Sequence, residues 1–224
     1  MSRAAVPVPT NVNEAYFFHG AKYSRAVYAP GLREQIITSP TAITAWKSLA
    51  EHGFDSVDAA LPVPGYPGEI YFFRGTKYIR IKLDPNTLDD SVVYGPASIA
   101  QKWTTLHSHG FETVDAILPV PGHENEAYFF SGNRYIRIKF VPSTSKESVI
   151  YGPASITEHW LSLSEANFDT VDAALPVPGE KYQAYFFSGS QYVRVKYQPN
   201  STPDSIVYGP RRITEYWESS RWGW

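Results

Sequence analysis

Acidic residues recur at a fixed spacing in this chain, a pattern that favours a repeated binding site over a single catalytic centre. The phrase VDAALPVPG or its near-copy VDAILPVPG stands at Val57–Gly65, Val114–Gly122 and Val171–Gly179. The aspartates of these copies, Asp58, Asp115 and Asp172, are 57 residues apart. A degenerate copy, RAAVPVP, begins at Arg3 and places a cation where the others carry an acid.

Aromatic and arginine residues repeat with the same spacing. The tyrosines of YGP segments, the arginines of alternating strands and the tryptophans of helical segments form three sets: Tyr94, Tyr151 and Tyr208; Arg80, Arg137 and Arg194; Trp103, Trp160 and Trp217. Aromatic rings stack on the C–H faces of sugars, and planar guanidinium groups donate paired hydrogen bonds. A protein with several such sites gains avidity. The sets are therefore candidate ligand-binding residues, and they predict a multivalent carbohydrate-binding lectin.

The same residues have a structural interpretation. Tryptophans can anchor a helix to a sheet, and arginines can stack on them or bridge neighbouring units. The first unit differs from the others, because it has ITSP at Ile37–Pro40 where they have YGP. A site built on these residues should therefore occur three times rather than four.

Each unit predicts the same secondary structure. In the third unit, EAYFFSG at Glu126–Gly132 is an apolar and aromatic strand that ends at glycine. YIRIK at Tyr135–Lys139 alternates apolar and charged residues, which predicts a strand with one buried face. A polar loop and the strand SVIYGP follow, and Ala154–Leu163 is expected to be helical with Ser155 as its N-cap. With the DAILP segment as the first strand, each unit has four strands and a short helix.

Four such units predict a closed ring. Units at approximately 3–57, 58–114, 115–171 and 172–224 cover the chain as one domain, and the second and third share 32 of 57 residues without gaps. A strand segment precedes the first EAYFF, and no fifth copy follows the last helix, so four complete sheets are expected. A four-stranded sheet repeated radially is a propeller blade. We therefore predict an all-β fold, a four-bladed β-propeller.

The composition argues against several functional classes. The formal net charge is −2, without the basic surface of a nucleic-acid binder. No apolar run approaches the ~20 residues of a membrane helix, so no membrane insertion is expected. There is no cysteine and no apolar leader segment, so we expect a cytoplasmic protein, with non-classical secretion left open. No P-loop, G-x-S-x-G or H-E-x-x-H motif is present, and we expect no enzymatic activity.

The segments YFFSGNRYIRIK, YGPASITEHW and FDTVDAALP resemble the hemopexin repeat, and the resemblance covers essentially the whole chain. The NEAYFF segment at Asn13–Phe18 and the YAPG loop at Tyr28–Gly31 are similar to the single-domain seed albumins of legumes. The chain departs from extracellular hemopexin domains, because it cannot form the disulfide that joins their first and last blades.

The resemblance implies a central channel that holds ions. Main-chain carbonyls at four positions would hold one cation, Ca²⁺ or Na⁺, and backbone groups further in would meet a second ion, with chloride as a further candidate. The first set is Arg3, Asp58, Asp115 and Asp172, and the second is Ala5, Ala60, Ile117 and Ala174. Any residue has a carbonyl, which would explain how Arg3 is tolerated. The alternative is that the aspartate side chains cap strand ends or bond neighbouring blades.

The resemblance also implies other channel ligands. Glu14, Glu69 and Glu126 recur before the second strand and with the aspartates could form an acidic mouth for a polyamine such as spermine, or they could be solvated strand ends. Haem needs axial ligands, usually histidines, and no histidine repeats at equivalent positions, so haem is disfavoured. The tail with Trp222 and Trp224 is expected to pack within the chain rather than to form a homodimer contact or a ligand site.

Overall fold

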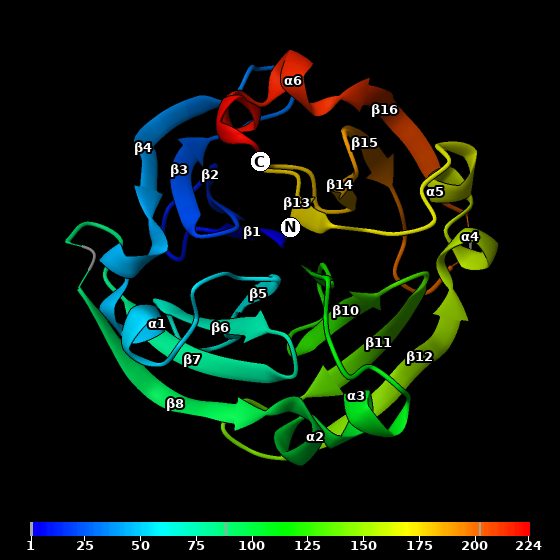
Figure 1. Ribbon diagram of the computed structural model, residues 1–224. Helices are drawn as coiled ribbons and strands as arrows, with labels where there is room; N and C mark the ends of the chain where they lie inside the picture. The colour runs from blue at the N-terminus through cyan, green and yellow to red at the C-terminus, as the bar shows by residue number, and fades with distance from the viewer. Residues whose placement is uncertain (1, 88, 202) are drawn as a thin grey trace.

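Each repeat forms one antiparallel sheet, and the four sheets surround a common axis (Figure 1). The computed structural model describes residues 2–87, 89–201 and 203–224. The strands of every sheet follow chain order, so a blade is one continuous stretch of chain. The first strand of each blade lies nearest the axis, and the fourth lies at the rim. The predicted all-β, four-bladed propeller is confirmed.

The blades contain the same elements in the same order. Blade 1 comprises β1 (Arg3–Pro7), β2 (Glu14–His19), β3 (Lys22–Val27), β4 (Gln35–Ala42), η1 (Ile43–Ala45) and α1 (Lys47–Glu51). Blade 2 comprises β5 (Ala59–Pro62), β6 (Glu69–Arg74), β7 (Lys77–Leu83), β8 (Asp90–Ser98), α2 (Ile99–Lys102) and α3 (Thr104–Ser108). Blade 3 comprises β9 (Ala116–Pro119), β10 (Glu126–Ser131), β11 (Arg134–Phe140), β12 (Glu147–Ser155), α4 (Ile156–His159) and α5 (Leu161–Glu165). Blade 4 comprises β13 (Ala173–Pro176), β14 (Gln183–Ser188), β15 (Gln191–Lys196), β16 (Ser205–Arg212), α6 (Ile213–Tyr216) and η2 (Glu218–Trp222).

The second strand of each blade is buried on both faces. Phe129 and Phe130 of β10 point to opposite sides of the sheet, because side chains alternate along a strand. The Phe129 ring lies 6.3 Å from Phe73 of blade 2, and the Phe130 ring lies 6.0 Å from Phe186 of blade 4. This double burial is the reason that the YFF runs are continuously apolar. An apolar core thus fills each contact between neighbouring blades, which we call a seam.

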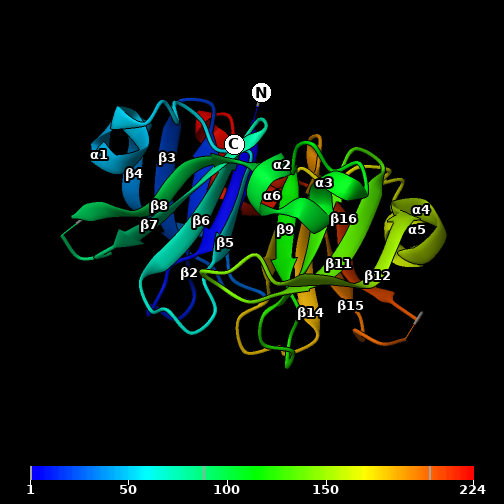
Figure 2. The ribbon, with the colours of Figure 1, turned by 90° about the horizontal axis from the view of Figure 1, so that it is seen from below.

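The seam between blades 4 and 1 closes the ring without a disulfide. Trp224 is 2% exposed, and its ring lies between Phe17 of β2 and Phe187 of β14, with centroids 4.8 and 4.7 Å away. Its indole Nε1 donates a hydrogen bond to the carbonyl oxygen of Ala4 at 3.2 Å. Trp224 therefore packs within the chain, and the two termini lie close together at one end of the channel (Figure 2).

The helical segment of each blade is interrupted at its tryptophan, so the single helix predicted over Ala154–Leu163 is wrong. In blade 3, α4 ends before Trp160 and α5 begins after it, because the Trp160 backbone is not helical (φ −104°, ψ 80°). The indole instead packs beneath the sheet, 5.3 Å from the ring of Tyr128 and 6.2 Å from that of Phe130. Ser155, the predicted N-cap, makes no side-chain hydrogen bond to the helix backbone. Burial of the tryptophan therefore determines the path of the chain here.

Candidate functional site

An irregularity in the outer strand places the tyrosine of each YGP segment at the surface. In blade 3, Arg137 of β11 pairs with Tyr151 of β12, and the register shifts on both sides of this pair. Gly152 follows with φ +87°, and a Cβ atom there would lie 2.9 Å from the carbonyl oxygen of Tyr135, so glycine is required. The Tyr151 ring stacks on that of Tyr135 with centroids 6.0 Å apart, yet 42% of Tyr151 remains exposed. A free aromatic surface results.

Three pockets of the same construction lie at the seams between blades 2 and 3, 3 and 4, and 4 and 1. Their volumes are about 600, 560 and 160 Å³. The structure brings the predicted tyrosine, arginine and tryptophan sets together, one member of each set per pocket: Tyr94, Arg80 and Trp103; Tyr151, Arg137 and Trp160; Tyr208, Arg194 and Trp217. The two larger pockets have the volume of typical small-ligand sites.

Each pocket takes its walls from two blades. In the pocket between blades 3 and 4, blade 3 contributes Tyr135 and Tyr151, and blade 4 contributes residues 197–201 of the loop that follows β15. In the pocket between blades 2 and 3, the second wall is the equivalent segment of blade 3, including residues 143–147. One blade alone therefore cannot form such a pocket.

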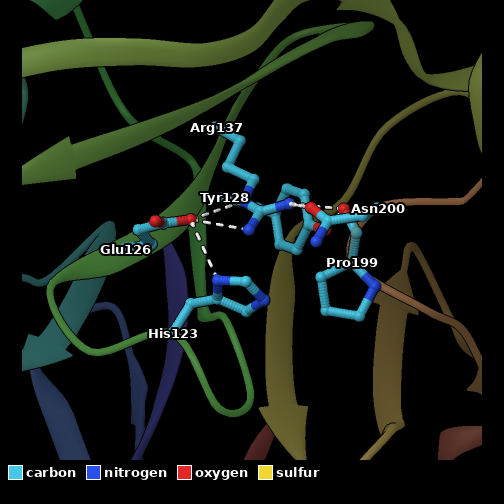
Figure 3. A network of polar contacts seen from close by, with 6 residues as sticks. All are labelled: His123, Glu126, Tyr128, Arg137, Pro199 and Asn200. Atoms are coloured by element: carbon cyan, nitrogen blue, oxygen red, sulfur yellow. Dashed lines mark hydrogen bonds and ion pairs between the residues drawn. The ribbon is translucent and has the colours of Figure 1, made fainter.

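The arginine of the pocket between blades 3 and 4 belongs to a network that crosses the seam (Figure 3). Arg137 is 2% exposed, and its Nε and Nη2 atoms donate to Glu126 Oε2 at 2.9 and 2.6 Å. Its Nη1 atom donates to the carbonyl oxygen of Pro199 and, at 2.9 Å, to Asn200 Oδ1, both in blade 4. His123 Nδ1 lies 3.9 Å from the same Glu126 oxygen. Arg137 therefore positions the loop of the next blade, and its donors are already engaged.

The equivalent arginines differ in their partners. Arg80 Nε donates to Glu69 Oε2 at 2.5 Å, and Nη1 donates to Ser143 Oγ of blade 3 at 2.6 Å. Arg194 Nε donates to the neutral Gln183 at 2.7 Å, and its Nη2 atom lies 3.9 Å from Oε1 of the exposed Glu180. Within the described ranges Arg194 has no hydrogen bond to blade 1. The Arg194 side chain is 15% exposed, against 3% for Arg80. Arg194 is thus the member of this set with donors left for a ligand.

The repeated tryptophans form the buried side of the pockets. Trp103, Trp160 and Trp217 are only 4–5% exposed and pack beneath the stacked tyrosines. The guanidinium groups of Arg80 and Arg137 approach the rings of Tyr71 and Tyr128, at 5.6 and 5.7 Å. Arg80 and Arg137 therefore bridge blades, one of the two roles considered from the sequence, and they stack on tyrosine rather than on tryptophan.

The seam between blades 1 and 2 lacks the exposed tyrosine. Arg25 pairs with Thr38, at the position that Tyr94 occupies opposite Arg80. Arg25 Nε donates to Glu14 Oε2 at 2.6 Å, as the arginines of blades 2 and 3 do to their glutamates, and its Nη1 atom donates to the carbonyl oxygen of Pro85 in blade 2 at 2.5 Å. The bridging arginine is thus present at this seam without the aromatic wall, which leaves three tyrosine-walled pockets.

A separate hollow of about 630 Å³ opens at the end of the channel near the termini. Arg3, Asp58, Asp115 and Asp172, the four positions that the resemblance assigns to the channel, line it together. Each aspartate Oδ2 atom also accepts a hydrogen bond at 2.7 Å from the backbone N–H of a turn glycine: Gly75, Gly132 and Gly189 respectively. The side chains therefore cap the turn between the second and third strands of their own blades.

The channel mouth combines three acids with one arginine. Burial raises the pKa of Asp115, the hydrogen bond from its turn glycine opposes this rise, and the charges of Asp58 and Asp172 add to it. Arg3 Nη1 lies 3.7 Å from Asp172 Oδ2 and compensates the acid of blade 4. The like charges of Asp58 and Asp115 favour a cation in the hollow.

The second set of predicted channel positions, those expected to meet a second ion, lies further along the inner strands. Each member pairs with a phenylalanine of the second strand: Ala5 with Phe17, Ala60 with Phe72, Ile117 with Phe129 and Ala174 with Phe186. An inner strand is hydrogen-bonded on one side only, so part of its backbone faces the channel. The described residues include no group of three His, Cys, Asp or Glu side chains placed to hold a metal ion.

The repeated glutamates do not belong to the channel mouth. Glu69 begins β6, whereas Asp58 caps the turn at the other end of that strand. Each glutamate instead forms an ion pair with the arginine of the third strand: Glu14 with Arg25, Glu69 with Arg80 and Glu126 with Arg137. The prediction that these glutamates join the aspartates in an acidic channel mouth is therefore wrong. The alternative, that they are solvated at the strand ends, is also wrong, because they are paired with arginines.

Sequence analysis missed a further set of acids that joins the blades. At or just before the outer strand, one acid accepts a hydrogen bond from the second helical segment of the preceding blade. The pairs are Asp90 with Ser48 N (2.9 Å), Glu147 with Thr105 N (2.8 Å), Asp204 with Ser162 N (3.2 Å) and Glu34 with Ser219 N (2.7 Å). An acid placed 42 residues after a Ser or Thr, three times over, was the available signal.

Known proteins resemble this chain over nearly its whole length. Albumin-2 of Pisum sativum is 28% identical over 212 residues, which are 93% of this chain and 90% of the relative. A plant albumin from Cicer arietinum showing hemagglutination superposes with a TM-score of 0.87 at 26% identity, covering 100% of this chain and 98% of that one. No protein-family model matches the chain.

Two other solved structures are similar to this one. A plant lectin with two metal binding sites from Cicer arietinum has a TM-score of 0.86 at 28% identity, covering 98% of this chain and 96% of its own. A hemopexin fold protein from cow pea has a TM-score of 0.86 at 26% identity, covering 99% and 97%. The resemblance to the hemopexin-type seed albumins of legumes is therefore confirmed, and the chain shares their four-bladed propeller.

The relatives correct one expectation. They are seed albumins, a class of secreted storage protein, so the cytoplasmic location expected from the sequence is wrong. The absence of cysteine was one reason for expecting a cytoplasmic location. It does not identify the compartment, because the packing of Trp224 closes the ring and no disulfide is needed there. No helix in residues 2–87, 89–201 or 203–224 has both the length and the apolar character needed to cross a membrane.

Proposed function

We propose that this protein is a non-enzymatic lectin that binds carbohydrate in the three pockets between its blades. The observation that carries this proposal is the repetition of one construction, an exposed tyrosine whose ring packs against a buried tyrosine beside a seam; the two rings are stacked in the two larger pockets and tilted in the smallest. Sugars present flat C–H faces to aromatic rings, and the exposed fractions of 41, 42 and 37% for Tyr94, Tyr151 and Tyr208 leave such a surface free.

The polar groups around these rings support the proposal. The pocket between blades 3 and 4 offers Tyr151, His159, Asn200 and Asp204, whose side chains can exchange hydrogen bonds with hydroxyl groups. Apolar walls with a few polar groups are typical of small-ligand sites.

The arrangement of the pockets around the ring supports a multivalent protein. The three seams face different directions from the axis (Figure 1), so one molecule can hold ligands on more than one surface. Weak individual sites then combine into strong binding. The similar albumin from Cicer arietinum that shows hemagglutination has the behaviour expected of such an arrangement.

The absence of enzymatic activity is part of the proposal. The similar proteins are albumins and lectins. Catalysis requires one arrangement of acid, base and positioning group, whereas the polar residues that stand out here recur from blade to blade.

A glycan array followed by titration of the best glycan tests the proposal. We expect one glycan class to bind, with about three sites per chain from the three pockets. Tyr151→Ala should remove one site and lower agglutination of erythrocytes. Tyr182→Ala is the matched control, because Tyr182 is also 37% exposed and lines none of these pockets. Binding that survives loss of all three pocket tyrosines would refute the proposal.

We also propose a structural cation in the channel, held by the main-chain oxygens of the Arg3, Asp58, Asp115 and Asp172 positions. The raised pKa of Asp115 among like charges supports it, because a cation would relieve their repulsion. Calorimetric titration with Ca²⁺ and Na⁺ tests this assignment. Spermine and haemin, the alternative channel ligands, should be titrated in competition, and a polyamine that displaces the cation one-for-one would shift the proposal toward polyamine binding.

A further inference from the structure

The three pockets differ at the residue that directly precedes the repeated tryptophan. These residues are Lys102, His159 and Tyr216, and each lines its pocket beside the exposed tyrosine. Lys102 Nζ lies 5.6 Å from the centroid of the Tyr94 ring. His159 Nδ1 lies 2.8 Å from the hydroxyl of Tyr151, and the ring of Tyr216 lies 5.7 Å from that of Tyr208. One scaffold therefore presents an ammonium, an imidazole or a phenol at the same place.

The pocket between blades 2 and 3 has a second lysine. Lys146 lines it from the wall that blade 3 supplies. The equivalent position in the next pocket is Pro203, 57 residues later, so that pocket has no lysine from either wall. Two exposed ammonium groups thus face one pocket, and none faces its neighbour.

The other two charged side chains that line this pocket, Arg80 and Glu147, already have partners. Arg80 is neutralised by Glu69 at 2.5 Å. Glu147 Oε2 accepts the hydrogen bond from Thr105 N, and burial raises the pKa of the Glu147 carboxyl. Within the described ranges neither Lys102 nor Lys146 forms an ion pair with a carboxylate. A ligand entering this pocket therefore meets positive charge that lacks a partner.

We propose that the pocket between blades 2 and 3 selects a sugar that carries a carboxylate or sulfate group, and that Lys102 is the residue that confers this selectivity. The proposal rests on the proposed carbohydrate function and gives that site a substrate class. The Tyr94 face takes the sugar ring, and Lys102 beside it pairs with the anionic substituent, while Lys146 on the opposite wall adds positive charge to the pocket. The pocket between blades 3 and 4, with His159 and Asn200, suits a neutral sugar.

Two sugars that differ only at C6, a carboxylate in glucuronate and a hydroxymethyl group in glucose, test the proposal. Glucuronate and glucose should be titrated against the ¹⁵N-labelled protein while the indole N–H signals of Trp103 and Trp160 are followed, since these rings line the two pockets. We expect glucuronate to shift the Trp103 signal with an affinity roughly fivefold higher than that of glucose, the effect of one exposed ion pair. Equal affinities at Trp103 would overturn the proposal.

Exchange of the variable residue tests the role of Lys102. Lys102→Gln should abolish the preference for glucuronate at Trp103, and His159→Lys should create one at Trp160. Lys196→Gln is the matched control, because Lys196 is an exposed lysine that lines none of the three pockets. A preference that survives in Lys102→Gln would show that Lys102 is not the selecting residue.

Cyclohexanecarboxylate separates failure of this inference from failure of the proposed function. It has the ring and the charge of a sugar acid but no hydroxyl groups. A Lys102-dependent shift at Trp103 with this probe, and none with either sugar, would keep the charge selectivity and reject carbohydrate as the ligand. No shift with any of the three probes would reject both.

Discussion

Glu34 of blade 1 accepts a hydrogen bond at 2.7 Å from the backbone N–H of Ser219 in blade 4. Glu34 is 2% exposed, and burial raises the pKa of its carboxyl to about 7, although the bond from Ser219 opposes the rise. The same type of contact occurs at the other seams, but this one closes the ring. We therefore expect the stability of the closing seam to depend on pH near neutrality.

Glu34→Gln should remove a pH dependence of stability. A carboxyl whose pKa rises from 4.5 to about 7 on folding stabilises the fold fully below pH 4.5. That contribution is lost as the pH rises through 7, and it amounts to roughly 2–3 kcal/mol. Urea unfolding at pH 4.5, 6.0 and 7.5 should show this decline in the wild type and a weaker one in Glu34→Gln. The exposed Glu215→Gln is the control, and parallel profiles for wild type and Glu34→Gln would contradict the prediction.

Trp224→Ala should open the closing seam. The side chain is 2% exposed between Phe17 and Phe187, so its loss should cost about 3–5 kcal/mol of unfolding free energy. Trp224→Phe keeps most of the packing and loses only the bond to Ala4, so it should cost less. Trp222→Ala, at a half-buried neighbour, is the comparison in the same urea titration. Similar losses for the two alanine variants would argue against a special role for Trp224.

Gly152→Ala should destabilise the protein more than Gly132→Ala. Both glycines have positive φ, at +87° and +55°, but only the Cβ atom at 152 would meet a backbone oxygen, at 2.9 Å. We expect a difference of about 1–3 kcal/mol in thermal or chemical unfolding. Because Gly152 follows Tyr151, the variant should also weaken ligand binding at that pocket. Equal stabilities would show that the outer strand relaxes without cost.

Arg137→Leu should cost more stability than Arg194→Leu. The first substitution leaves the half-buried Glu126 carboxylate without its partner, a loss of about 3–5 kcal/mol. The second leaves the neutral Gln183 and the solvent-exposed Glu180, a loss of about 1 kcal/mol. The double variant Arg137→Leu/Glu126→Leu should recover part of the first loss, because the unpaired charge is then gone. Equal losses in the two single variants would show that the charge of Glu126 is not what matters.

Comparison of Asp115→Asn with Asp115→Ala should separate two contributions of Asp115: the hydrogen bond that caps the turn at Gly132 and the negative charge in the channel mouth. The asparagine oxygen can still accept the bond from Gly132, whereas alanine cannot, so only Asp115→Ala should lose about 1 kcal/mol of stability. Both variants should weaken calcium binding modestly if a carbonyl carries the metal. Complete loss of binding in Asp115→Asn would instead identify the carboxylate as the ligand.

The repeats made the fold predictable, because the apolar YFF runs and the 57-residue period define the blades directly. The gathering of Tyr151, Arg137 and Trp160 was also accessible, since residues at equivalent positions of a ring occupy equivalent places. The pairing of Glu126 with Arg137 was hidden, because the two residues meet only through the hairpin register of β10 and β11.

Features that depend on the next blade were not accessible from one repeat. The loop at Pro199 that receives Arg137 is 62 residues away in the chain, and no local pattern points to it. The break at Trp160 was missed because the apolar spacing of Ile156, Trp160 and Leu163 fits one continuous helix. Burial of the indole beneath the sheet instead takes the Trp160 backbone out of the helical conformation.

Each tyrosine pocket has one wall from each of two blades, so a lone ancestral repeat would have had no ligand site. Binding at such a place becomes possible only after duplication has set two copies side by side. A ligand in the pocket touches both copies and holds them together, so occupancy should also resist separation of the blades. In this architecture, a ligand that binds between two blades would also stabilise the contact between them.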